Sequence, residues 1–367
     1  MSKVKLSEIG TFKNGLNFSA ERVLSGCKMI GVPDFGDNYL AKLDGLKEVD
    51  EDIVSTDYLL QDNDILFVRS NGNKNLVGRA MLIEKIKEKV TFSGFCIRFR
   101  ITNNNVNPLY MLYLFKSPLF RKLFSNTQQT SISNLNQEIL GNIEVELPTI
   151  GQQNRIVKVI HGITRKIENN KRINDNLEHQ IQLIFDYLFP DVCAGNKHMG
   201  DFIIPKRGKS LLSKNAVHGN VPVIAGGLEP SIYHNVANTV APVVTISSSG
   251  ANAGFVNIWG IPVWSSDSSY IDSEMSQYVY FWYAYLKRHQ NNIYNIQTGS
   301  AQPHIYPSHI SSLPITDLDY KKIEKYTEIV NPIFSTITKN HVENQHLQSL
   351  RDWLLPMLMN GQATISD

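Results

Sequence analysis

The stretch IVKVIHGITRKIENNKRINDNLEHQIQLIFDYL, residues 156–188, decides the architecture of this chain. Its apolar residues recur with a seven-residue period, and YTEIVNPIFSTITKNHVENQHLQSLRDWLLPML at 326–358 repeats that pattern. The two copies align at one constant shift of 170 residues, which matches Ile163 with Ile333 and Leu177 with Leu347. A seven-residue period sustained over more than three heptads predicts a long helix whose apolar stripe packs against another helix.

Two asparagines interrupt the apolar stripe at the same place in both copies. They are Asn170 and Asn174 in the first copy and Asn340 and Asn344 in the second. A polar seam residue costs stability and fixes register, so the matched pairs predict that the two stripes face each other. An antiparallel pairing would bring the asparagines opposite one another. The alternative is two separate amphipathic helices, each packed on its own globular segment.

A globular segment, here called a head, precedes each helix. The similarity covers 131–188 and 301–358, whereas KNG at 13–15 and KRG at 206–208 are 193 residues apart, so loops in the heads differ in length. The repeated pattern therefore predicts a pseudo-twofold molecule with an α+β fold. We predict a first head at 1–150, a helix at 151–189, a linker at 190–198, a second head at 199–316 and a second helix at 317–361.

Local patterns predict similar elements in both heads. In the first head, 95–101 alternates apolar and polar residues, which predicts a strand with one buried face. Residues 64–69 predict a further strand, and the aromatic run 109–124 predicts a helix. The second head repeats this plan with a strand at 242–247 and an aromatic helix at 278–287.

Composition limits the classes of function. A chain of 367 residues with 42% hydrophobic content supports two domains with cores of their own. The 36 Lys and Arg against 34 Asp and Glu give a net charge of +2, which excludes histone-like binding of nucleic acid driven by charge alone. The 3 cysteines lack CxxC spacing, so we expect a reducing, cytoplasmic setting and no structural zinc. We expect no signal peptide and no membrane segment.

Motifs for catalysis are missing from the sequence. GKS at 208–210 resembles the end of a P-loop, but Ile203 stands where the first glycine of that motif belongs. No methyl-donor motif is present, and the histidines of the second head lack metal-ligand spacing. The acidic run DED at 50–52 fits a solvated loop at least as well as a nuclease site. We therefore predict a non-catalytic chain without a cofactor or metal of its own.

Polar loops in both heads carry the side-chain types that read DNA bases. In the major groove, Arg and Lys bond guanine, whereas Asn and Gln bond adenine. A single polar loop residue is more often merely solvated, but clusters at equivalent places in two heads favour DNA recognition. The predicted DNA-contact residues are Lys13, Asn14, Asn17, Arg69, Ser70, Asn71, Asn73, Lys74, Arg79, Gln128 and Gln129 in the first head, and Lys206, Arg207, Lys209, Ser248, Asn252, Gln297 and Gln302 in the second.

Four further segments, in their order, give the chain a family resemblance. LSEIGTFKNG at 6–15 opens the first head, and GSAQPHI at 299–305 stands late in the second. IFDYLF at 184–189 and LRDWLLPMLMNG at 350–361 close the two helices. Together with the repeat, they resemble the specificity (S) subunit of type I restriction-modification enzymes over nearly the full chain.

The resemblance implies two target recognition domains, each reading one half of a split sequence in double-stranded DNA. Two antiparallel coiled-coil helices would act as the spacer and as the docking surface for two modification subunits. Restriction subunits would complete the complex, and the methyl donor, ATP and Mg would serve those partner chains.

Two alternatives stay open at this point. One is a specificity chain of a related modification system that lacks restriction. The other is a coiled-coil scaffold whose heads bind protein or carbohydrate. The aromatic segment 278–285 would suit a sugar or peptide surface, although its helical periodicity places most of it in a core.

Overall fold

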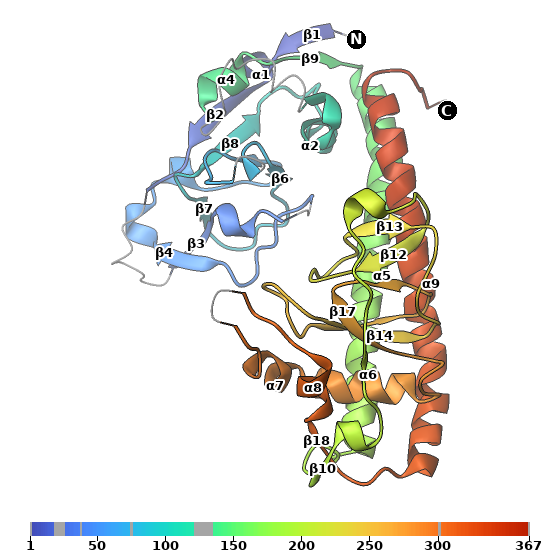
Figure 1. Ribbon diagram of the computed structural model, residues 1–367. Helices are drawn as coiled ribbons and strands as arrows, with labels where there is room; N and C mark the ends of the chain where they lie inside the picture. The colour runs from blue at the N-terminus through green and yellow to red at the C-terminus, as the bar shows by residue number, and fades with distance from the viewer. Residues whose placement is uncertain are drawn as a thin grey trace. The chain divides into compact units, whose positions relative to one another are not determined.

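The computed structural model of the chain describes residues 2–17, 26–36, 39–73, 76–120, 135–299 and 302–365. The chain divides into two compact units, Met1–Arg165 with Leu347–Asp367 (unit 1) and Lys166–His346 (unit 2). Each unit holds one head together with a part of each of two long helices (Figure 1).

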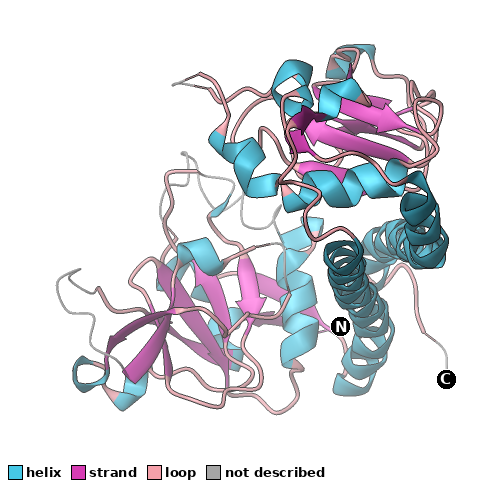
Figure 2. Cartoon of the chain, turned by 90° about the horizontal axis from the view of Figure 1, so that it is seen from below, coloured by secondary structure: helices cyan, strands magenta, loops and turns pink. Residues whose placement is uncertain are grey.

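The long helices carry the seven-residue patterns. Helix α5 spans Ile150–Leu188 and α9 spans Tyr320–Met359. They lie side by side, as Figure 2 shows in a view nearly along their axes. The expected antiparallel pairing is confirmed, because in unit 2 Asn170 Nδ2 donates to Asn344 Oδ1 at 2.9 Å and Asn340 Nδ2 donates to Asn174 Oδ1 at 2.8 Å. The alternative of two separately packed helices is therefore wrong.

The head of unit 1 is built on a four-stranded antiparallel sheet in the order β2-β8-β5-β6. A three-stranded sheet, β4-β3-β7, covers one of its faces, helix α2 covers the other, and β1 pairs with β9. The elements are β1 Ser2–Lys5, α1 Leu6–Ile9, β2 Gly10–Asn14, β3 Gly26–Ile30, η1 Val32–Asp34, β4 Lys47–Asp50, η2 Glu51–Ile53, η3 Thr56–Tyr58, β5 Ile65–Val68, β6 Ala80–Leu82, β7 Val90–Phe92, β8 Cys96–Ile101, α2 Pro108–Lys116, α4 Gln137–Gly141 and β9 Glu144–Leu147.

The head of unit 2 repeats this topology. Its sheets have the orders β11-β17-β14-β15 and β13-β12-β16, and β10 pairs with β18. The described residues thus give both heads one four-stranded, one three-stranded and one two-stranded sheet. The elements are β10 Lys197–His198, η5 Met199–Asp201, β11 Lys206–Arg207, η6 Ser213–Asn215, β12 Val221–Ile224, β13 Ile232–His234, β14 Val243–Ser247, β15 Val256–Trp259, β16 Trp264–Ser265, β17 Ser268–Asp272, α6 Val279–Arg288, α7 Gln290–Asn295, α8 Pro307–Ser311 and β18 Pro314–Ile315.

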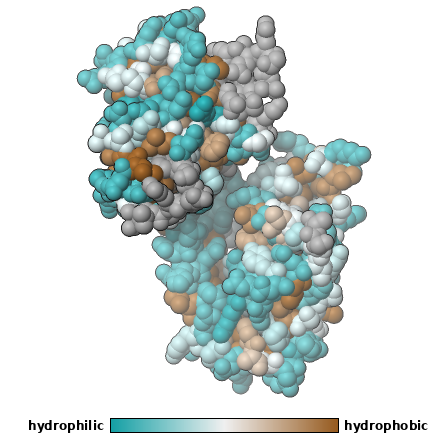
Figure 3. Space-filling model, turned by 90° about the vertical axis from the view of Figure 1, so that its left-hand side faces the viewer, coloured by the Kyte–Doolittle hydropathy of each residue, from teal (hydrophilic) through white to brown (hydrophobic). Residues whose placement is uncertain are grey.

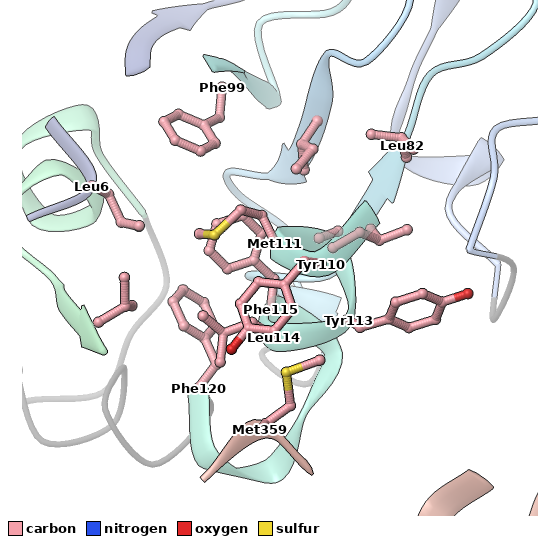
Figure 4. Close-up of a cluster of buried hydrophobic side chains, with 14 of the residues drawn as sticks. Leu6, Leu82, Phe99, Tyr110, Met111, Tyr113, Leu114, Phe115, Phe120 and Met359 are labelled. Carbon is pink, nitrogen blue, oxygen red and sulfur yellow. The ribbon is translucent and has the colours of Figure 1, made fainter. Parts of the chain in front are cut away.

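The heads and the helices share their cores. In unit 1, Met359 of α9 packs with Tyr110, Met111 and Phe115 of α2 in one cluster of buried apolar side chains (Figure 4). In unit 2, the corresponding cluster joins both long helices to α6 and to the four-stranded sheet. Because one face of each long helix packs on a head while another packs on the partner helix, the hydrophobic effect stabilises the head and the helix pair together.

Strand β8 is buried on both faces, which corrects the expectation of one buried face. Ile97 and Phe99 belong to the core with α2, whereas Cys96 lies in the second core, under the three-stranded sheet. Arg98 is also buried, and its guanidinium donates to backbone carbonyls. Phe95, expected within the strand, precedes it, and its side chain is 59% exposed. Alternation along a strand reports which side chains share a face, not what covers that face.

Two aromatic helices differ from their predicted extents or roles. Helix α2 ends at Lys116 because Ser117 precedes Pro118, and a residue before proline disfavours helical backbone. Residues 121–124 of the predicted helix lie outside the described residues. Helix α6 buries Trp282 and Tyr285, so this aromatic run is core and offers no sugar-binding surface.

Candidate nucleic-acid interface

Predicted DNA-contact residues of unit 1 gather at one edge of the four-stranded sheet. Because the sheet is antiparallel, the ends of β2 and β5 and the starts of β8 and β6 share that edge. Lys13 and Asn14 end β2, residues 69–73 follow β5, and Arg79 precedes β6. Strand order, which differs from sequence order, thus brings residues more than sixty positions apart to one place.

Lys13 is held by two partners at this edge. Its Nζ lies 3.1 Å from Asp57 Oδ2 and 4.2 Å from the centre of the Tyr58 ring. The Asp57 carboxylate is largely exposed, with 79% of its side chain accessible. An exposed ion pair of this kind contributes ~0–1 kcal/mol, so it orients the ammonium without binding it tightly.

The loop after β5 is ordered by its own polar groups. Arg69 NH1 donates to Gly94 O at 3.3 Å, and Asn71 Oδ1 accepts from the backbone N of Asn73 at 2.7 Å. The second bond is the Asx turn that asparagine makes in tight loops. Ser70, which lies between them, is half-buried. These bonds give the loop a defined shape while most of its side chains keep contact with solvent.

Of the other residues predicted in the first head, Asn17 is among the described residues, whereas three more are not. Asn17 is exposed, and its side-chain oxygen lies so close to Gly94 that a Cβ there would clash with it. Leu135, where the described chain resumes, donates its backbone N–H to Arg69 O at 2.8 Å. The predicted residues Lys74, Gln128 and Gln129 lie outside the described residues.

The head of unit 2 presents the same edge, built with the same backbone bonds. The backbone N of Ser248 donates to Asp267 O at 3.1 Å, as Arg69 N donates to Phe95 O at 2.7 Å. Ile305 N donates to Ser248 O at 2.9 Å, as Leu135 does to Arg69. The loop after β14 in unit 2 is therefore the structural equivalent of the loop after β5 in unit 1.

An ion pair marks the edge of unit 2. Arg207 NH2 lies 2.6 Å from Asp267 Oδ1, and the hydroxyl of Ser249 donates to the other oxygen of the same carboxylate. Lys206 and Lys209, on either side of Arg207, are exposed. Arginine has five N–H donors, so Arg207 keeps donors for a ligand while Asp267 sets its orientation.

Two predicted residues of the second head are used within the fold, since one side chain is buried and the other bonds to the backbone. Ser248 is 1% exposed, and its hydroxyl has no hydrogen-bond partner among the described residues. Gln297 Nε2 donates to Ala253 O at 2.7 Å, which closes the loop. Asn252 is half-buried and Gln302 is exposed. Sequence reasoning missed Asp267, whose place at the edge follows only from the pairing of β14 with β17.

An ion pair between the half-buried Arg100 and the buried Asp64 lies in the sheet behind the edge of unit 1. Arg100 donates from Nε and NH2 to the two oxygens of Asp64, both at 2.7 Å, and the Asp64 side chain is 1% exposed. The hydrogen bond with Asp64 raises the pKa of Arg100, whereas burial lowers the pKa of Arg98. Arg98 and Arg100 of β8 thus form bonds within the head, whereas Arg69 and Arg79 lie at the edge of the sheet.

Three further observations concern the hydropathy of the surface, a possible metal site and a possible membrane-spanning helix. Figure 3 shows a mainly hydrophilic face on which hydrophobic residues form separate patches. Within the described ranges, no cluster of three or more His, Cys, Asp and Glu side chains is placed to hold a metal ion. In that same part of the chain, no helix is both long and apolar enough to cross a membrane.

The sequence and the fold match proteins of one family. Residues 1–179 match the model of the type I restriction modification DNA specificity domain. The match covers just under half of the chain, and over these residues the chain is similar to that domain. The matched residues cover the first head and most of α5.

Curated specificity subunits are similar to parts of the chain. The specificity subunit of the type I restriction enzyme StySPI from Salmonella potsdam is 28% identical over 129 residues, which are 34% of this chain and 26% of that protein. The putative MjaX specificity subunit from Methanocaldococcus jannaschii is 23% identical over 166 residues, or 44% of this chain and 39% of that protein. The MjaIX specificity subunit from the same organism is 23% identical over 319 residues, or 76% and 73%. The resemblance to specificity subunits is confirmed.

A solved structure shows the same fold. The S subunit of the type I restriction-modification system from M. genitalium matches with a TM-score of 0.60 and 17% identity, over 100% of this chain and 96% of that chain. At this identity the likeness shows the fold alone.

Proposed function

We propose that this chain is the non-catalytic DNA specificity subunit of a type I restriction-modification complex, in which each head reads one half of a bipartite double-stranded target. The observation that carries the proposal is the duplicated sheet edge. Both edges are built with the same backbone bonds, and both present basic side chains, Lys13 in unit 1 and Lys206 with Arg207 in unit 2. Two equivalent edges in one chain fit two half-sites.

Low net charge agrees with recognition by placed side chains. With a net charge of +2, the chain as a whole attracts DNA weakly. Sequence preference then depends on a few bonds to base edges, each worth about 1–3 kcal/mol. Arg207, oriented by Asp267, suits a guanine, and the amide of Asn71 suits an adenine.

The long helices are proposed as the spacer and the docking surface for two modification subunits. Leu183 of α5 and Trp353 of α9 are related by the 170-residue shift, and their side chains are 55% and 60% exposed. Large apolar side chains exposed on a helix mark a contact for a partner. Because the repeat presents this feature twice, two copies of one partner fit the chain. Restriction subunits, the methyl donor, ATP and Mg²⁺ complete the system in the partner chains.

Binding to designed duplexes tests the division of labour between the heads. The target is first determined by mapping methylated sites in cells that carry the system. Replacing Arg207 and Lys209 with alanine should then weaken discrimination in one half-site, whereas replacing Arg69 and Asn71 should weaken it in the other. Each lost base contact should cost about 1–3 kcal/mol. Equal effects on both half-sites would contradict two independent heads.

Native mass spectrometry tests the docking surface. Leu183→Glu and Trp353→Glu should each remove one modification subunit, and the double variant should remove both, because a buried, unpaired carboxylate is costly. Tyr233→Glu is a matched control, since Tyr233 is 44% exposed on a head rather than on a helix. Loss of both partners from either single variant would argue against two separate docking sites.

A further inference from the structure

The turn that leads into β8 is held from several sides. Arg69 N–H donates to Phe95 O at 2.7 Å, and the Arg69 guanidinium donates to Gly94 O. Gly94 N donates to Leu16 O at 2.6 Å, and Gly15 N donates to Cys96 O at 3.1 Å. The turn is thus bonded to the two segments that carry Asn14, Asn17 and Arg69. Such a turn presents its side chain in a defined place.

That side chain is an exposed phenylalanine. Phe95 is 59% exposed, the largest exposed fraction of any large hydrophobic residue in the part of this head that the structure describes. The side chains held against this turn are polar: Arg69 donates to Gly94 O, and the amide of Asn17 lies close to Gly94. An aromatic ring left in water costs free energy that burial in the head's core would recover.

The second head shows that the fold does not require an aromatic residue here. Asp267 occupies the equivalent position, because Ser248 N donates to Asp267 O as Arg69 N does to Phe95 O, and Gly208 N donates to Ser268 O as Gly15 N does to Cys96 O. There the side chain is a carboxylate paired with Arg207. One position of the repeat therefore carries an apolar side chain in one head and an ionic one in the other.

We propose that this position determines specificity, and that Phe95 contacts the 5-methyl group of a thymine in the half-site of the first head. The inference rests on the proposed function. Thymine is the base that offers an apolar group in the major groove, where the neighbouring arginine and asparagine types also find their partners. The equivalent Asp267 is a positioning residue, which orients Arg207.

Replacing thymine with uracil, which lacks the methyl group, tests the contact. The full chain is used in complex with its modification subunits, on the duplex defined by methylation mapping. Each thymine of the first head's half-site is replaced in turn. For the wild type, one replacement should weaken binding about four-fold, the effect of ~0.8 kcal/mol for one methyl-sized group removed from an apolar contact. Phe95→Ala should bind the thymine and uracil duplexes equally.

Control variants distinguish a folding defect from loss of the contact between Phe95 and thymine. Phe95→Leu, which stays apolar, should retain part of the preference for thymine. Phe95→Ala should still discriminate in the other half-site as the wild type does. Asp267→Ala should leave the thymine preference unchanged and weaken discrimination only in the second half-site.

Three results would overturn the proposal. They are a half-site in which no thymine is sensitive to replacement, an alanine variant that still prefers thymine, and an alanine variant that loses its modification subunits instead. The last would make Phe95 a protein contact. Failure of the wild type to prefer the mapped duplex over a shuffled one would refute the proposed function itself, which is a separate outcome.

Discussion

Replacing Asn170 with leucine tests what the asparagine layer contributes to the helix pair. Asn170 is 2% exposed, and its Nδ2 donates to Asn344 Oδ1 at 2.9 Å and to Glu343 Oε2 at 2.7 Å. Asn344 is 6% exposed, so water cannot replace the lost donor. The single variant leaves a buried amide oxygen unpaired, which should lower the free energy of unfolding by about 1–3 kcal/mol.

The double variant Asn170→Leu with Asn344→Leu should recover most of that loss. Both buried amides are then gone, and two leucines meet in an apolar seam, where removing both partners of a buried polar pair is close to neutral. We expect each single variant to be less stable than the double variant. Leucine at Asn169, which is exposed beside the seam, is the matched control and should change stability by less than about 0.5 kcal/mol.

Urea unfolding followed by far-ultraviolet circular dichroism measures all four variants beside the wild type. The double-mutant cycle isolates the interaction between the two positions. If the double variant loses as much as the two single variants combined, the amides act independently, and the stabilising bond between Asn170 and Asn344 is refuted.

Three other predictions concern spacing, stability and pH. Deleting residues 170–176 together with 340–346 removes one heptad from each helix, ~10 Å of length, so methylation mapping should show the same half-sites with a gap about 3 base pairs shorter; an unchanged gap would assign the spacing to the heads. Asp64→Ala removes the charged hydrogen-bond partner of Arg100 and should lower the free energy of unfolding by about 1.5–3 kcal/mol in urea; a loss under about 0.5 kcal/mol would contradict this. Burial lowers the pKa of His289, so the stability that its neutral form contributes is present above the unfolded pKa of ~6.5 and is lost as the pH falls from there toward the lower folded pKa. The variant His289→Phe should therefore show a smaller fall in Tm between pH 7.5 and pH 5 than the wild type. An equal fall in Tm in the two proteins would exclude this histidine as the cause.

The strands show where local patterns succeed and where they stop. The segments 64–69 and 95–101 contain β5 and β8, because β-branched and aromatic residues favour extended backbone. The same alternation placed Phe95 inside a strand and left Arg98 on an open face. Both errors have one cause, since the three-stranded sheet that covers β8 comes from distant parts of the chain.

The sequence by itself determined the helix pair and the duplication. A heptad pattern is a local property, and asparagines at matching seam positions are satisfied only when two stripes meet in antiparallel order, as Asn170 and Asn344 do. The tertiary structure alone decided which polar residues share an edge and which of them face outward. Strand order brings Lys13 and Arg69 to the same edge, on either side of β8, and the packing of neighbouring loops buries Ser248 while it leaves Phe95 in solvent. Pairing between distant strands depends on what each face buries, and no local pattern records that.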